Sequence, residues 1–178
     1  MSNPQPGFGV LAIKTIITHT LTYFLVGLVA FTVLNYTELY ARPDVAAYMR
    51  QTNEPIVALG PALQPIRGLL FALVFYFLRE PLFGRNHGWL IIWLMLVVLG
   101  IFATFGPAPA SVEGLIYLKA PMQEQLSGGL LEVLVQALLF AMLLYYWVNH
   151  PQQRWLSWGL GLAFVLVIFM SLMGFFMA

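Results

Sequence analysis

The chain has 178 residues, of which 61% are hydrophobic, 15% aromatic and only 8% charged. Because a typical soluble domain is about 25% charged, this composition excludes a soluble globular domain and a disordered chain, and it predicts an integral membrane protein. Eight basic residues against seven acidic ones leave no concentrated basic surface, which excludes nucleic acid as a partner. The absence of cysteine excludes disulfides and cysteine nucleophiles.

The length has room for about five spans, since each spanning helix takes about 20 residues. The predicted fold class is therefore all-α: a polytopic helical bundle of about five transmembrane helices with short extracytoplasmic helical segments, built as a single membrane domain over residues 1–178. The spans are expected at about residues 11–34, 60–78, 89–105, 129–148 and 155–177. The first apolar run is too long for the core of a cleaved secretory signal, so we interpret it as a retained helix.

Breaker residues mark the limits of the later spans. The second span is interrupted by Pro61, Pro65 and Arg67, and it is long enough to cross only if Arg67 lies inside it. The third is followed by a run of glycine and proline that starts at Gly106. The short turn over residues 149–151 predicts that the fourth and fifth spans form an antiparallel hairpin.

Two segments between spans are expected to carry short helices. Residues 37–53 predict a helix that begins near Pro43, because proline suits a first helical turn. Tyr40 would hold this segment at the membrane interface. In residues 106–118, Ser111 is a plausible N-cap for a helix that folds back into the bundle or lies on its surface.

Basic residues in the loops predict the orientation, because short cytoplasmic loops are enriched in lysine and arginine. Four basic residues fall on the side of the N-terminus and three on the other side, in longer loops. We place the chain in the bacterial inner membrane, with the N-terminus in the cytoplasm and the C-terminus outside. The tryptophans support this, because most of them fall at the cytoplasmic interface as an aromatic belt: Trp89, Trp147, Trp155 and Trp158, with Trp93 one turn deeper.

Arg67 and Glu132 are the most informative residues, since an ionised side chain inside a span is costly and usually faces a partner or a polar cavity. Counted from the cytoplasmic ends of their spans, they lie about 18 Å and 26 Å deep. An arginine side chain can bridge a difference of about 8 Å, so we predict an ion pair between them. Gln64 and Gln136 lie one turn away and extend the polar cluster.

Glu113 is the competing partner for Arg67 if its segment folds back into the bundle. A phosphate group of a lipid is a further alternative. The pair could serve only to dock two helices, or it could line a polar binding site.

Three histidines are weak candidates for a metal or haem site, because His19, His87 and His150 fall toward the cytoplasmic side. His87 and His150 lie in polar turns, where a histidine is usually just solvated. No cofactor is therefore expected.

No motif of nucleophilic, phosphate-binding or metalloprotease chemistry occurs in the chain. The sequence favours a non-catalytic component of a membrane assembly that packs against other chains, interacts with them or binds lipid. The expected partners are membrane lipid and either another membrane protein or a second copy of the chain. The alternatives are a transporter of small solutes or ions that uses the Arg67 and Glu132 cluster, and a membrane enzyme that acts on lipid.

Overall fold

The computed structural model describes residues 6–177, and in this range the chain is all-helical. Four helices are long and apolar enough to cross a membrane. They are α1 (Phe8–Val33), α4 (Gly60–Phe77) with the preceding turn η1 (Pro55–Leu59), α9 (Gly128–Asn149) and α10 (Arg154–Phe176). The prediction of an all-α membrane bundle is confirmed.

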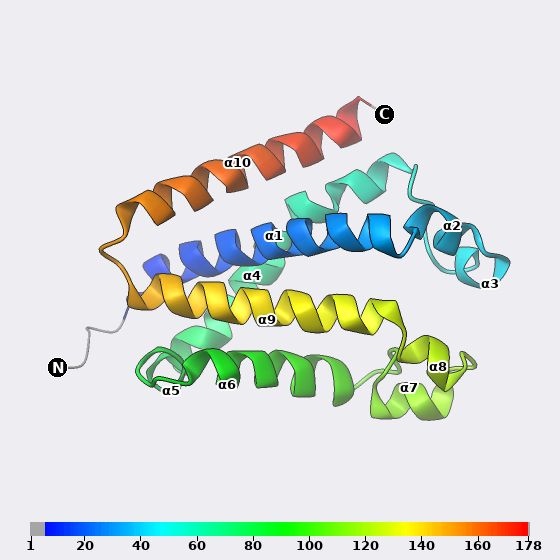
Figure 1. The fold of residues 1–178 in the computed structure, drawn as a ribbon, viewed down its shortest axis with the longest axis horizontal. Coiled ribbons are helices and arrows are strands. Elements are labelled where there is room, and N and C mark those ends of the chain that lie inside the picture. The colour runs from blue at the N-terminus through cyan, green and yellow to red at the C-terminus, as the bar shows by residue number, and fades with distance from the viewer. Residues whose placement is uncertain (1–5, 178) are drawn as a thin grey trace.

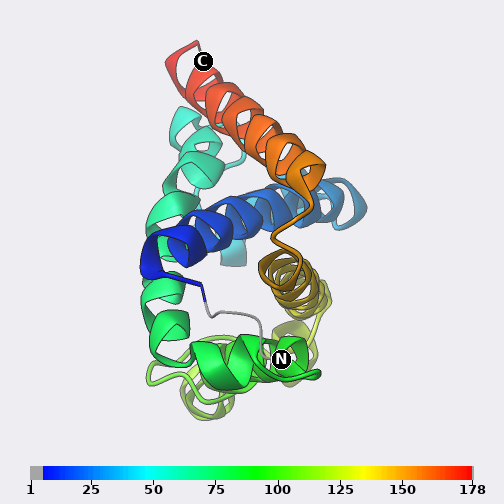
Figure 2. The ribbon, with the colours of Figure 1, turned by 90° about the vertical axis from the view of Figure 1, so that its left-hand side faces the viewer.

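The remaining elements are short. They are α2 (Tyr36–Ala41), α3 (Pro43–Ala46), α5 (Arg79–Phe83), α6 (Gly88–Leu94), η2 (Met95–Phe102), α7 (Val112–Tyr117) and α8 (Met122–Gln125). The long helices run side by side and alternate in direction, and α2, α3, α7 and α8 gather at one end of the bundle (Figure 1). Helix α1 occupies the centre, where it packs against α4, α9 and α10 (Figure 2).

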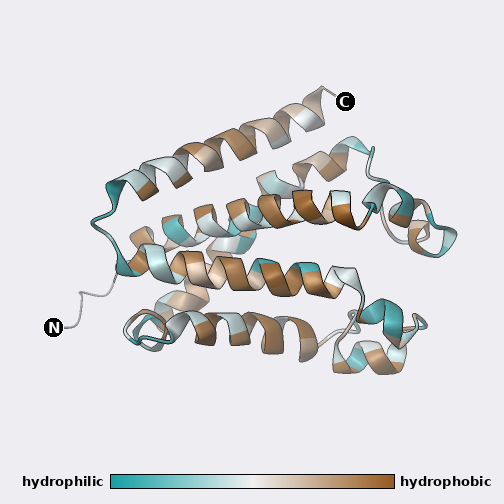
Figure 3. Cartoon of the chain, in the orientation of Figure 1, coloured by the Kyte–Doolittle hydropathy of each residue, from teal (hydrophilic) through white to brown (hydrophobic). Residues whose placement is uncertain are grey.

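The burial pattern of α1 is the reverse of that in a soluble protein. Thr15, Thr18 and Thr20 are fully buried, whereas Val10 and Ile13 are 54% and 60% exposed. Such a helix suits a surrounding of hydrocarbon, because lipid imposes no cost on exposed apolar side chains and polar side chains lie inside the bundle. Hydrophobic residues predominate along the long helices, with a few hydrophilic turns in α1, α4 and α9, and most of the other hydrophilic residues lie in the loops (Figure 3).

The third predicted span differs in length and geometry from expectation. It consists of α6 and η2, which together form an apolar segment of 15 residues over Gly88–Phe102. Its second part is a π-helix, whose last turn closes with a bond from the Ala103 N–H to the Val98 carbonyl at 2.8 Å. At about 1.5 Å per residue the segment is about 22 Å long, shorter than the hydrocarbon core of about 30 Å.

The hairpin predicted for the last two spans is present in the antiparallel direction of the two helices but not in their side-by-side packing. Helices α9 and α10 run antiparallel, but α1 lies between them in Figure 1, and α10 packs against α1, α4 and η1. The linker at residues 150–153 is a turn, in which the Gln153 N–H donates to the His150 carbonyl at 3.2 Å. Trp147 is also not part of an aromatic belt, because it is only 3% exposed, whereas Trp155 and Trp158 are 72% and 80% exposed.

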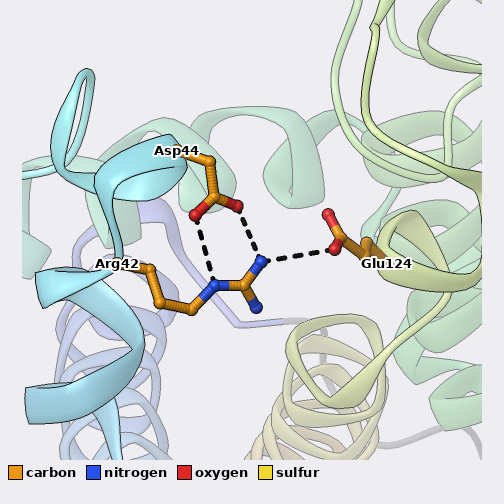
Figure 4. A network of polar contacts seen from close by, with 3 residues as sticks. All are labelled: Arg42, Asp44 and Glu124. Carbon is orange, nitrogen blue, oxygen red and sulfur yellow. Dashed lines mark hydrogen bonds and ion pairs between the residues drawn. The ribbon is translucent and has the colours of Figure 1, made fainter.

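The loop segments follow the local signals in the sequence. Pro43 begins α3 and occupies its first turn, as predicted. Ser111 is the N-cap of α7, and its Oγ accepts from the Gly114 N–H at 2.9 Å. At the same end of the bundle, Arg42 bridges Asp44 at 2.7 Å and Glu124 of α8 at 3.3 Å (Figure 4). The hydrogen bonds from Arg42 hold the pKa of the exposed Asp44 carboxyl below its usual value.

Candidate functional site

Arg67 and Glu132 lie at different depths of the bundle. A methyl group added to Gly27 would lie 3.9 Å from Oε1 of Glu132, so this carboxylate is level with Gly27 of α1. Arg67 lies between Gly68, which is packed against Ile16, and Gln64, which bonds to His19. The two levels are therefore eight to eleven residues of α1 apart, which is about 12–17 Å along its axis.

The predicted ion pair is wrong for this reason. Within residues 6–177, Arg67 forms an ion pair with neither Glu132 nor Glu113. The expected depths assumed that α4 and α9 end at the same level, and the two helices are instead offset along the bundle axis. Arg67 is exposed, and its guanidinium lies 5.7 Å from the centre of the Phe71 ring.

The other residues of the predicted cluster have separate surroundings. Gln64 belongs to the interface of α1 and α4, where its Oε1 lies 3.1 Å from Nε2 of His19. Gln136 and Glu113 are half-buried on α9 and α7. The structure therefore distributes the predicted cluster over several places and leaves Glu132 as the carboxylate of interest.

The three histidines are not brought together. His19 is 2% exposed and packs edge-on against Phe71 and Phe140, with ring centres 5.0 and 5.3 Å away. His87 is exposed in the loop before α6, and His150 stacks on Tyr146 at 4.1 Å. In the described part of the chain, no three potential ligands from histidine, aspartate and glutamate lie together as a metal site would require.

Glu132 lines a cavity of about 430 Å³ at the end of the bundle where α2 and α3 lie. The cavity is partly open, and its volume falls within the usual range for small-molecule sites. Its walls come from α1, α2, η1, the start of α4, α9 and α10, and from the loop before η1. The lining residues are Tyr23, Phe24, Gly27, Leu28, Phe31, Tyr36, Tyr40, Thr52, Val57, Ala58, Pro61, Glu132, Met170 and Ser171.

Tyrosines surround the carboxylate. The hydroxyl of Tyr36 donates to Oε2 of Glu132, and the ring of Tyr36 stacks on that of Tyr40 with centres 5.0 Å apart. Burial, and then the hydrogen bond to Glu132, raises the pKa of Tyr36 above its ordinary value. Burial and the nearby negative charge also raise the pKa of Tyr40. Both phenols therefore stay neutral near pH 7.

Ser171 joins two walls of the cavity. Its Oγ accepts from the Ala62 N–H at 3.1 Å and donates to the Ala58 carbonyl, so it fixes the end of α10 to the start of α4. The Ala62 N–H is one of the donors that a helix N-terminus leaves without a partner inside the helix.

Sequence reasoning missed Ser171 and the tyrosines of α1 and α2. A signal existed for Ser171, because it is the single polar residue of the run from Phe164 to Met177. Tyr40 was interpreted only as an interfacial anchor. The convergence of Tyr23, Tyr36 and Tyr40 on Glu132 depends on how α2 folds back after α1, which no local pattern reveals.

The chemistry available in the cavity is that of binding. One carboxylate, three phenols, the Thr52 hydroxyl and the structural Ser171 hydroxyl are set among apolar side chains. Among the lining residues there is no second carboxylate, no histidine and no lysine that could share proton transfer with Glu132. The arrangement suits a ligand with a large apolar part and a polar group placed at Glu132.

Comparisons of this chain with protein families, with characterised proteins and with solved structures found no match. The cavity and its carboxylate are therefore the features on which a function can rest.

Proposed function

We propose that the protein is a non-catalytic membrane protein that binds an amphiphilic, lipid-like molecule in the cavity at Glu132. The observation that supports this proposal is the cavity itself: about 430 Å³, walled by aromatic and aliphatic side chains, with one carboxylate. Lipid supplies ligands of this kind at high local concentration. Association with another membrane protein or with a second copy of the chain stays a prediction.

The test is to fill the cavity and measure bound lipid. Gly27 lines the cavity, and a Cβ atom there would meet nothing closer than 3.9 Å, so leucine at this position projects into the free volume. We expect Gly27→Leu, purified in nanodiscs and analysed by native mass spectrometry, to lose a tightly retained amphiphile. Gly159→Leu is the matched control, because Gly159 of α10 is exposed and faces open space.

Thermal unfolding provides a second readout. A ligand present at 100 times its dissociation constant stabilises a protein by about 2.7 kcal/mol. Delipidated protein should therefore melt at a lower temperature and recover when the retained amphiphile is added back, whereas Gly27→Leu should not respond. Equal lipid occupancy in Gly27→Leu and Gly159→Leu would disprove the proposal.

A transporter is the second candidate, and a specific observation favours it. Nδ1 of His19 and the Oγ1 atoms of Thr18 and Thr20 are buried without a hydrogen-bond partner in the described residues. They lie within about one and a half turns of Tyr23, the first α1 residue of the cavity, on the side of the N-terminal end of α1. In proteoliposomes, a transporter would move solute at a rate that His19→Phe lowers, whereas a binding protein would show no flux.

A further inference from the structure

The carboxylate of Glu132 has no positive partner in its cavity. Within residues 6–177, no lysine or arginine forms an ion pair with it, and the lining contains neither residue type. Its Oε2 accepts the Tyr36 hydroxyl, while Oε1 is on the side of Gly27, where an added Cβ would make only an ordinary van der Waals contact with it at 3.9 Å. An ionised carboxylate in apolar surroundings is costly unless a positive charge accompanies it.

Aromatic rings supply a large part of the cavity wall. Five of them line the cavity: Tyr23, Phe24, Phe31, Tyr36 and Tyr40. The face of an aromatic ring attracts a cation, and rings that surround an ammonium group are a common means of binding it. Because Tyr36 and Tyr40 remain neutral phenols near pH 7, they offer ring faces and hydroxyl groups rather than competing negative charges.

We infer that the ligand of this cavity carries a positively charged ammonium head, which is held by the Glu132 carboxylate and the surrounding aromatic rings. The inference rests on the proposed function and names the class of amphiphile: an alkylammonium compound or a lipid whose headgroup ends in an amine or a quaternary ammonium. A metal ion fits the cavity poorly, because Ca²⁺ requires six to eight oxygen ligands and Mg²⁺ a near-octahedral set. The cavity offers one carboxylate among largely apolar side chains.

The test compares two probes of the same shape. Dodecyltrimethylammonium carries the positive charge, and 2,2-dimethyltetradecane replaces its nitrogen by carbon and is uncharged. Binding of each to the unaltered protein is measured in nanodiscs of neutral lipid, by native mass spectrometry and by the rise in melting temperature. We expect the cation to bind about 10-fold more tightly or better, since cation–π contacts and a charge-assisted contact with the carboxylate add to apolar burial.

Three variants test whether the preference for the cationic probe arises in the cavity. Glu132→Gln keeps the shape and an acceptor for Tyr36 but removes the charge, so it should reduce the preference for the cation to the part that the aromatic rings supply, while leaving binding of the neutral probe unchanged. Tyr40→Leu removes one ring and should weaken the cation by about 2- to 30-fold. Glu113→Gln is the matched control, because Glu113 lies on α7 outside the cavity, and it should retain the full preference.

The outcomes separate this inference from the proposed function. If the two probes bind equally and Gly27→Leu loses the binding of both, the inference of an ammonium head is wrong, whereas the proposed amphiphile site is supported. Failure of both probes to occupy the cavity would reject the proposed function as well. A preference of undiminished size in Glu132→Gln would also overturn the inference, and the comparison of probes on the unaltered protein decides the question even if that variant does not fold.

Discussion

Lys14 is a buried lysine that caps a neighbouring helix. It is 9% exposed, its Nζ donates to the Trp147 carbonyl at 2.7 Å, and it lies 5.3 Å from the centre of the Trp147 ring. Inside a helix this carbonyl would accept from the N–H four residues later, but that residue is Pro151, which has none. A lysine on α1 thus supplies the donor that α9 lacks, and its positive charge suits a helix C-terminus.

Replacing Lys14 by methionine should therefore destabilise the protein by about 1–3 kcal/mol, the cost of a buried polar group without a partner. The measurement is the free energy of unfolding by sodium dodecyl sulfate in mixed micelles. Pro151→Ala restores an N–H at the right position, so in the Lys14→Met background it should recover part of the loss. If the change in unfolding free energy of the double variant equals the sum of the two single changes, the hydrogen bond from Lys14 to the Trp147 carbonyl does not account for the effect of Lys14.

The features that were easiest to predict from the sequence were those set by a few neighbouring residues. Ser111 as N-cap and Pro43 in a first helical turn follow from side-chain chemistry that acts over three or four residues. The partner of Glu132 was not predictable in this way, because Tyr36 is 96 positions away and meets it only after α2 folds back.

At the level of elements, α1 and α4 pack so closely that one position requires glycine. A Cβ added to Gly68 would lie 2.7 Å from the Cα atom of Ile16, which is backbone and cannot move without separating the helices. Small residues allow such close approach between membrane helices. Ala137 and Ala141 of α9 are small residues spaced four apart, and both are buried as well.

Gly68→Ala should destabilise the bundle by about 1–3 kcal/mol through overpacking, even though alanine favours a helix by up to about 1 kcal/mol. Gly161→Ala is the control, because a Cβ at Gly161 of α10 meets nothing within 4 Å, and this change should be neutral or slightly stabilising. Both are measured by thermal unfolding followed by circular dichroism. Equal melting temperatures for the two variants would show that the α1 and α4 contact is not as close as described.

The offset between α4 and α9 leads to a prediction for Arg67. Removing one partner of a buried ion pair costs about 3–5 kcal/mol, and residues more than about 7–10 Å apart behave additively. Because Arg67 is exposed on a spanning helix and has no ion-pair partner in the described residues, Arg67→Leu should not destabilise the bundle and should leave it as stable as the unaltered protein or more stable. In a double-mutant cycle with Glu132→Gln, the coupling energy between Arg67 and Glu132 should stay below about 0.5 kcal/mol. A larger value would show that the two residues do interact.

For the molecule as a whole, composition and apolar run length were sufficient to predict the class of fold. They could not predict which helices touch, because lipid-facing and buried positions are both apolar and carry no distinguishing period. That is why α10 was expected beside α9 and instead packs on α1, α4 and η1. The same ambiguity hid the offset of α4 against α9, on which the predicted ion pair depended.

The number of crossings and their orientation can be tested directly, because the chain has no cysteine and single cysteines can be introduced without a background. Ala47 and Gln123 are exposed at the end of the bundle that holds α2, α3, α7 and α8, and Asn86 and Gln152 are exposed at the opposite end. With the N-terminus in the cytoplasm, a membrane-impermeant maleimide added to intact cells should label Ala47→Cys and Gln123→Cys. Asn86→Cys and Gln152→Cys should react only after permeabilisation.

Comparison of Asn86→Cys with Gln123→Cys isolates the short segment of α6 and η2. At about 22 Å it crosses only if the bilayer thins beside it or its ends are stabilised by protein. The bond from Trp93 Nε1 to the Leu134 carbonyl at 3.2 Å holds it against α9 and favours a crossing. Labelling of both positions from the same side would mean that this segment does not cross, whereas an exchange of the two groups would keep five crossings and reverse the orientation.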